Sequence, residues 1–102
     1  MNEKVAVFGV LRFPPETMPR VLPHLASFVE ATRANDGCIA HDVAEDLSDP
    51  GLIRFSELWP SQESLDAHLR APHIIPWRVA ARENGLLERK FMAYEIAGAR
   101  DV

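Results

Sequence analysis

Short apolar runs and segments that alternate between apolar and polar residues predict four strands along the chain. Residues 5–13 form a nearly continuous apolar run rich in valine and phenylalanine, which is typical of a strand covered on both faces. Residues 38–45 and 52–59 alternate between apolar and polar positions, as strands with one buried face do. Residues 86–97 read as a last strand. Turn-forming residues at 47–51 separate the second and third strands, so we expect these two to form a hairpin.

The two stretches between these strands show the spacing of three to four residues that is typical of helices. Within residues 16–35 apolar side chains recur every three or four positions, which predicts an amphipathic helix. Pro23 removes a backbone donor, so we expect either a late start of this helix or a local bend. Ser61 is the expected N-cap of a short helix that ends near Leu69, and residues 77–84 can form another short helix.

The order strand, helix, strand, strand, helix, strand predicts an α+β fold of the ferredoxin-like βαββαβ type. One antiparallel sheet then carries its helices on a single face. The opposite face stays partly apolar and uncovered, so we expect a homodimer that buries it. Residues 1–102 should form one domain, because the length suits a single core.

Composition narrows the classes of partner. The net charge is −4 and the eleven basic residues are scattered, so nucleic acid is not an expected partner. The single cysteine, Cys38, excludes an intrachain disulfide framework, and its apolar surroundings suggest a small buried filler. The first strand is too short for a membrane span and lacks a signal-peptide cleavage region. We therefore expect a cytoplasmic protein without a membrane partner.

One face of the third expected strand and one stripe of the helix that follows it together suggest a candidate active site. Strand alternation places Phe55, Glu57 and Trp59 on one face, and helical spacing places Leu65 and His68 on one stripe. If this stripe faces the sheet, the carboxylate and the imidazole share a cavity. Such a pair is suited to proton abstraction, because burial and a neighbouring charge move both pKa values toward neutrality.

A structural interpretation stands beside each of these assignments. His68 can be an inward histidine satisfied by Glu57 or by a backbone carbonyl. Trp59 and Trp77 can be core or cavity-wall residues, where their flat apolar rings would contact an aromatic ligand. His73 can join the cavity or simply precede a helix as a solvated side chain.

Metal and nucleotide sites are not expected. His68 and His73 are five residues apart with Pro72 between them, which does not match the helical face of an HExxH motif, and the sequence suggests no third ligand. No glycine-rich phosphate loop and no GxSxG motif are present. His41 shares the apolar face of its strand, so we expect it to be structural.

Four segments together suggest a family. DGCI at 36–39, DLSDP at 46–50, FSELW at 55–59 and SLDAHLRAPH at 64–73 resemble the antibiotic biosynthesis monooxygenase family, including quinol-monooxygenase-like members. The resemblance implies a dimeric α/β barrel with one cavity in each subunit. It also implies oxidation of quinol or anthrone-type aromatic substrates without metal, flavin or haem.

Individual positions both support and limit this resemblance. Trp59 matches a tryptophan that matters in several members, and His68 matches a frequent histidine of the motif. The haem-degrading branch uses an asparagine in the first strand, and residues 5–13 contain none. Phe55 is apolar where some anthrone-oxidising members carry a polar side chain.

The leading hypothesis is a cofactor-independent monooxygenase that acts on a small aromatic or quinol. His68, assisted by Glu57, takes a proton, and Trp59 positions the ring. Four further residues are expected to bind the substrate, namely Phe55, Leu65, His73 and Trp77. The alternatives are a non-catalytic ligand-binding or stress-response module, and an isomerase or lyase that works without oxygen.

Overall fold

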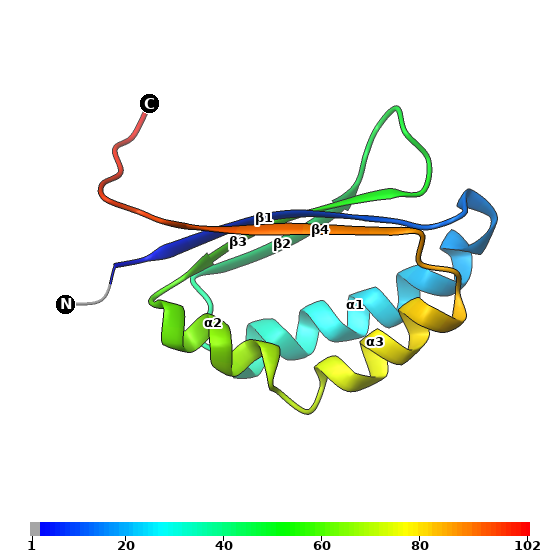
Figure 1. Cartoon of the computed structure of the whole chain (residues 1–102), viewed down its shortest axis with the longest axis horizontal. Helices are drawn as coiled ribbons and strands as arrows, with labels where there is room; N and C mark the ends of the chain where they lie inside the picture. Colours follow the sequence, from blue (N-terminus) through cyan, green and yellow to red (C-terminus); the bar gives the residue numbers. More distant parts are fainter. Residues whose placement is uncertain (1–2) are drawn as a thin grey trace.

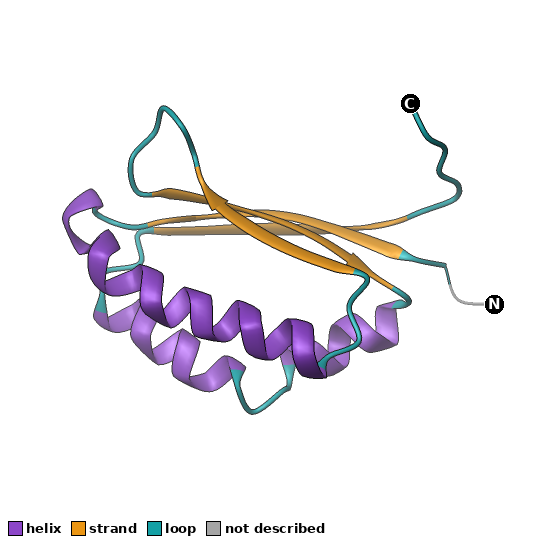
Figure 2. Cartoon of the chain, turned by 180° about the vertical axis from the view of Figure 1, so that it is seen from behind, coloured by secondary structure: helices purple, strands orange, loops and turns teal. Residues whose placement is uncertain are grey.

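The chain folds into one antiparallel sheet with all of its helices on one face (Figures 1 and 2). The structure, a computed structural model, describes residues 3–102. The elements in chain order are β1 (Val5–Arg12), the 3-10 turn η1 (Pro15–Thr17), α1 (Met18–Asn35), β2 (Ala40–Glu45), β3 (Leu52–Trp59), α2 (Gln62–Leu69), α3 (Ile74–Glu83) and β4 (Glu88–Glu95).

The strand order across the sheet is β2-β3-β1-β4, and every neighbouring pair is antiparallel. β2 and β3 form the expected hairpin, while β1 lies in the centre between β3 and β4. The predicted ferredoxin-like α+β fold is confirmed. β4 is an edge strand, so its side chains border any opening between the sheet and the helices that cover it.

Two prolines test the helix predictions. α1 begins at Met18 and runs through Pro23, so Pro23 does not delay the helix. α3 begins at Ile74, three residues before the expected start, because Pro76 lies in the first turn, where a backbone donor is not needed. None of the helices in residues 3–102 combines the length and the apolar character that crossing a membrane requires.

A reciprocal cap fixes where α2 begins. The Ser61 hydroxyl accepts a hydrogen bond from the backbone N–H of Ser64 at 3.2 Å, and the Ser64 hydroxyl accepts one from the backbone N–H of Ser61 at 3.2 Å. The predicted N-cap is therefore confirmed. With this start, Leu65 and His68 are the buried residues of α2.

Gly9 allows two aromatic rings to meet on the inner face of the sheet. It pairs with Phe55 on β3 and with Phe91 on β4, and the centroids of those two rings lie 5.1 Å apart. A Cβ atom at Gly9 would lie only 2.1 Å from the Phe91 ring. Only glycine leaves room for this pair, which forms part of the cavity wall described below.

The outer face of the sheet carries uncovered apolar side chains. Phe8, Met92 and Tyr94 are 55%, 54% and 51% exposed, and the centroids of the Phe8 and Tyr94 rings lie 6.1 Å apart. Phe8 pairs with Met92 across β1 and β4, and Tyr94 lies two residues further along β4 on the same face, so the three form one patch rather than scattered positions. We refer to Phe8, Met92 and Tyr94 as the outer patch.

Candidate functional site

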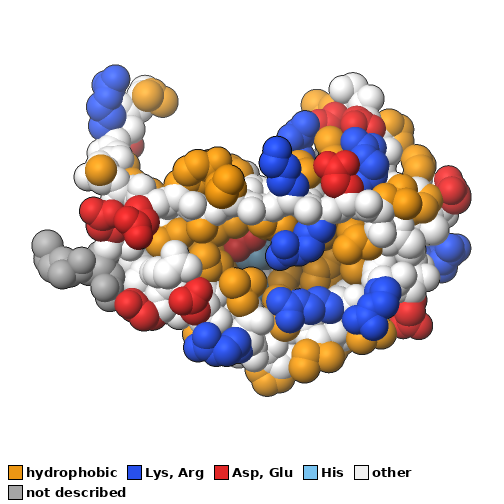
Figure 3. Space-filling view, in the orientation of Figure 1, with side chains coloured by type: hydrophobic (Ala, Val, Ile, Leu, Met, Phe, Trp, Pro, Cys, Tyr) orange, Lys and Arg blue, Asp and Glu red, His pale blue; other side chains and the backbone are white. Residues whose placement is uncertain are grey.

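A cavity of about 620 Å³ lies between the inner face of the sheet and the helices. The space-filling view shows it as a hollow with histidine at depth and basic side chains around its mouth (Figure 3). The predicted site residues that line it are Phe55, Glu57, Leu65, His68 and Trp77. The volume is in the range of pockets that bind small organic ligands.

Asp36 orients two histidines at one side of this cavity. Its Oδ2 atom lies 2.7 Å from Nδ1 of His68 and 2.8 Å from Nε2 of His73. The Asp36 and His68 side chains are 8% and 4% exposed. Because an ionised carboxylate can only accept, both ring nitrogens donate to Asp36. Asp36 follows α1 at the turn toward β2, a position for which the sequence predicted no functional role.

This contact decides which nitrogen of His68 is free to accept a proton. With Nδ1 donating to Asp36, the neutral ring keeps its lone pair on Nε2. Among residues 3–102, no hydrogen bond engages Nε2. An imidazole held by a carboxylate at one nitrogen and free at the other is the arrangement that general bases use.

Glu57 lies on β3, and Trp59 on the same strand holds its carboxylate in place. Its Oε1 atom accepts a hydrogen bond from the indole Nε1–H of Trp59 at 2.9 Å, and the Glu57 side chain is 6% exposed. Burial raises the pKa of Glu57 above its usual value, while the Trp59 hydrogen bond and the nearby His68 and Arg89 act in the opposite direction. Glu57 can therefore exchange a proton more readily than an exposed carboxylate.

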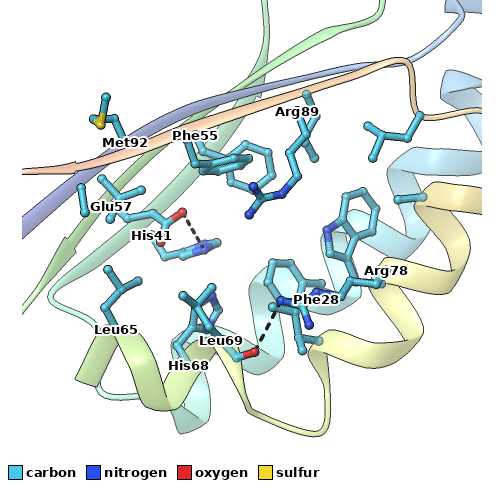
Figure 4. A pocket seen from close by; sticks show the side chains of 18 of the residues that line it. Phe28, His41, Phe55, Glu57, Leu65, His68, Leu69, Arg78, Arg89 and Met92 are labelled. Carbon is cyan, nitrogen blue, oxygen red and sulfur yellow. Dashed lines mark hydrogen bonds and ion pairs between the residues drawn. The ribbon is translucent and has the colours of Figure 1, made fainter. Parts of the chain in front are cut away.

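His41 completes a polar group at the inner end of the cavity, which Figure 4 shows beside Glu57. Its Nε2 atom lies 3.7 Å from Oε2 of Glu57, and neither ring nitrogen has a hydrogen-bond partner within residues 3–102. Burial, and then the nearby His68, lower the pKa of His41 to about 4, so its ring is neutral near pH 7 and the contact is not an ion pair there. We call His41, Glu57 and His68 the inner polar group.

Among residues 3–102, two sets of side chains could hold a metal ion. Asp36, His68 and His73 form one set, and the inner polar group forms the other, with the potential ligand atoms of each set within 4.8 Å of one another. Asp36 is thus the third potential ligand that the sequence did not suggest. In the first set each histidine already donates to Asp36, so that set is satisfied by hydrogen bonds alone.

Two of the predicted site residues lie outside the cavity lining. Trp59 is fully buried; it packs against the His68 ring at a centroid distance of 4.7 Å and donates to Glu57, and both of these side chains line the cavity. His73 donates to Asp36 and is 22% exposed. Trp59 therefore lies behind two side chains that line the cavity, whereas His73 is bonded to Asp36 outside the lining.

Three arginines that the sequence analysis did not single out line the cavity, namely Arg78, Arg82 and Arg89. We call them the rim arginines. Arg89 projects from β4 into the cavity (Figure 4). Alternation along β4 contains the signal for its placement, because Arg89 and Phe91 are two residues apart and share a face. His41, which the alternation of its own strand also placed on the apolar face and which we expected to be structural, lines the cavity as well.

Comparisons with known proteins agree on one family. The sequence profile described as antibiotic biosynthesis monooxygenase matches residues 4–79. A Mycobacterium tuberculosis protein named "Putative monooxygenase Rv0793" is 30% identical over 83 residues, which cover 81% of each chain. An uncharacterised Synechocystis protein, sll1783, is 25% identical over 72 residues, or 71% of this chain. The match spans 49% of that protein, so this chain corresponds to about half of its length.

A solved structure shows the same arrangement over nearly the whole chain. The crystal structure of a "putative antibiotic biosynthesis monooxygenase" from Deinococcus radiodurans superposes with a TM-score of 0.89 at 30% identity. The superposition covers 96% of this chain and 97% of the other. Sequence and fold therefore lead to the same assignment.

Proposed function

The chain belongs to the antibiotic biosynthesis monooxygenase family, and from this premise we propose that it oxidises a small aromatic or quinol-type substrate without metal, flavin or haem. One observation carries the proposal. His68 is fixed by Asp36 through Nδ1, keeps Nε2 free, and lines a mostly apolar cavity beside Glu57. This arrangement supports a base that acts on a bound aromatic molecule.

The reaction begins with proton transfer to Nε2 of His68. Removal of a proton from an acidic C–H of an anthrone-like substrate leaves a carbanion that the aromatic system stabilises, and this carbanion bonds to O₂. The O–O bond then breaks, so that one oxygen stays as a carbonyl and the other leaves as water. One CH₂ group and one O₂ give one C=O group and one H₂O, and the electrons come from the substrate.

Glu57 and Trp59 have supporting roles in this scheme. Ionised Glu57 stabilises His68 after the ring has gained its proton, because the two lie in one inner polar group. Trp59 keeps the Glu57 carboxylate in place through its indole N–H. Phe55, Leu65 and Trp77 form the apolar walls that exclude water from the substrate.

Oxygen uptake with a panel of anthrones and quinols tests the proposal. The wild-type protein should consume O₂ in proportion to substrate, and His68→Gln should lower kcat by about 10²-fold to 10⁴-fold. His24→Gln, which changes an exposed histidine of α1, is the matched control and should be unaffected. Uptake that His68→Gln leaves unchanged would contradict the assignment of the base.

Two further measurements separate this reaction from its alternatives. Activity should survive dialysis against EDTA; loss that an added metal restores would point to Asp36, His68 and His73 as ligands and would overturn the cofactor-free reaction. Product formation without O₂ would identify an isomerase or lyase. Binding without turnover of any substrate would identify a ligand-binding module.

We also propose that the chain is a homodimer whose interface includes the outer patch. Phe8, Met92 and Tyr94 are each more than half exposed on the uncovered face of the sheet. Paired aromatic and sulfur-containing side chains of this kind are typical of protein interfaces. A second copy of the same sheet would present the same patch about a two-fold axis.

A further inference from the structure

Like some other arginines of residues 3–102, the rim arginines lack carboxylate partners. Arg12, Arg33 and Arg54 form ion pairs with Asp49, Asp42 and Asp46. Within residues 3–102, no carboxylate lies within 4.0 Å of the basic nitrogens of any rim arginine. In a chain with fifteen acidic residues and a net charge of −4, three unpaired guanidinium groups around one cavity favour an anionic ligand.

Arg89 is the best placed of the rim arginines. It stands on the inner face of β4, and its guanidinium carbon lies 4.7 Å from the centroid of the Phe91 ring. Contact with an aromatic face restrains the planar group without using its N–H donors. Those donors remain free for the two oxygens of a carboxylate, which a guanidinium binds in a bidentate manner.

The inner polar group supplies a second, independent sign of a polar ligand atom. The His41 side chain is 0% exposed and lines the cavity, yet neither of its nitrogens has a hydrogen-bond partner in the part of the chain that the structure describes. A buried donor or acceptor without a partner destabilises the folded protein. A ligand hydroxyl can donate to Glu57 and accept from a ring N–H of His41, which would satisfy both residues at once.

Aromatic side chains lie between these two ends. Phe28, Phe55 and Trp77 line the cavity, and the rings of Phe28 and Trp77 stack with an interplanar angle of 15° and centroids 6.0 Å apart. We propose that the cavity binds an aromatic hydroxy acid, with its carboxylate at Arg89 and its hydroxyl at His41 and Glu57. This inference deepens the proposed function and rests on it for the reaction, whereas the binding itself is measured without turnover.

Three probes of nearly equal size test this orientation by calorimetry under nitrogen. They are 6-hydroxy-2-naphthoate, its uncharged amide 6-hydroxy-2-naphthamide, and 2-naphthoate, which lacks the hydroxyl. The hydroxynaphthoate should bind the wild-type protein about tenfold more tightly than the amide, as a charge-assisted bidentate contact predicts. Raising the salt concentration should weaken binding of the acid and leave the amide unchanged, because the rim arginines are exposed.

Variants assign the two ends separately. Arg89→Gln should remove the preference for acid over amide, while Arg70→Gln, an exposed arginine outside the cavity lining, should keep it. His41→Phe should remove the preference for hydroxynaphthoate over naphthoate. The inference is overturned if the wild-type protein binds the amide as tightly as the acid, binds no probe, or keeps its acid preference in Arg89→Gln.

These outcomes are separable from failure of the proposed function. Binding with the expected acid preference but without O₂ uptake would sustain the ligand class and refute the oxygenase reaction. O₂ uptake from uncharged aromatics, with no gain from a carboxylate, would sustain the reaction and refute the ligand class.

Discussion

Nδ1 of His68 lies 2.7 Å from Oδ2 of Asp36, although the two residues are 32 positions apart in the sequence. The contact joins the end of α1 to α2, and both side chains are more than 90% buried. A buried carboxylate at this position fixes the tautomer of the imidazole as well as its orientation. The reactivity of His68 therefore depends on a residue that does not line the cavity.

Replacing Asp36 with asparagine tests this dependence. Asp36→Asn should lower kcat for O₂ uptake by about 10-fold to 100-fold, because the tautomer with a free Nε2 loses its charged partner. The measurement is steady-state oxygen consumption across substrate concentrations. KM should change little, because Asp36 does not line the cavity.

A double variant distinguishes positioning from a general structural role. If Asp36 acts through His68, the variant that carries both Asp36→Asn and His68→Gln should be no slower than His68→Gln alone. Losses that multiply would show that Asp36 affects activity independently of His68.

Trp59→Phe should shift the acid limb of the pH profile of kcat to higher pH. The indole N–H lowers the pKa of Glu57, and burial raises it, so removing the donor leaves burial less opposed. A higher pKa means that Glu57 becomes ionised only at higher pH. Trp77→Phe is the control, because Trp77 lines the same cavity without donating to Glu57. An acid limb that stays in place in Trp59→Phe would refute this role of the indole.

Local patterns in the sequence account for most of the fold and for the inward placement of Glu57 and His68 in the inner polar group. Alternation along β3 placed Glu57 beside Phe55 on the inner face, and helical spacing turned His68 inward; both side chains are buried there. These faces are dictated by periods of two and 3.6 residues, which act within one element. Register between strands then follows from the same buried faces.

Such patterns could not predict contacts between residues on different elements. Asp36 meets His68 only because the end of α1 lies against α2, and nothing in the turn at 36–39 indicates that partner. Trp59 shares the inner face with Glu57, but only the packed structure shows that its ring is sealed behind that carboxylate and His68. Periodicity predicts the face of a side chain, whereas neighbours from other elements decide whether it reaches a cavity.

His41 should make the folded protein sensitive to acid. Its pKa is about 4 in the folded protein against an ordinary value of 6.5, so between these values the unfolded chain binds more protons. Stability conferred by the neutral ring is therefore lost as the pH falls from about 6.5 toward 4. Glu57, whose pKa is raised, contributes in the opposite sense, since it loses stability as the pH rises above its ordinary value.

His41→Phe isolates the histidine contribution. The loss of unfolding free energy between pH 7 and pH 5, measured by urea denaturation, should be smaller by about 2 kcal/mol in His41→Phe than in the wild-type protein. Comparing each protein with itself at two pH values removes any constant effect of repacking. An equal loss in both proteins would show that His41 titrates normally.

The outer patch should control the association of subunits. Light scattering of the wild-type protein should give twice the 11.4 kDa mass of one chain, and Phe8→Lys should give a single chain, because a charge within an apolar interface is left without a partner. Phe8 is 55% exposed within one subunit, so the variant should keep its fold and its far-ultraviolet circular dichroism. Leu47→Lys is the matched control, since Leu47 is an exposed apolar residue in the turn between β2 and β3. A dimer that persists in Phe8→Lys would place the interface elsewhere, and a wild-type monomer would refute the dimer itself.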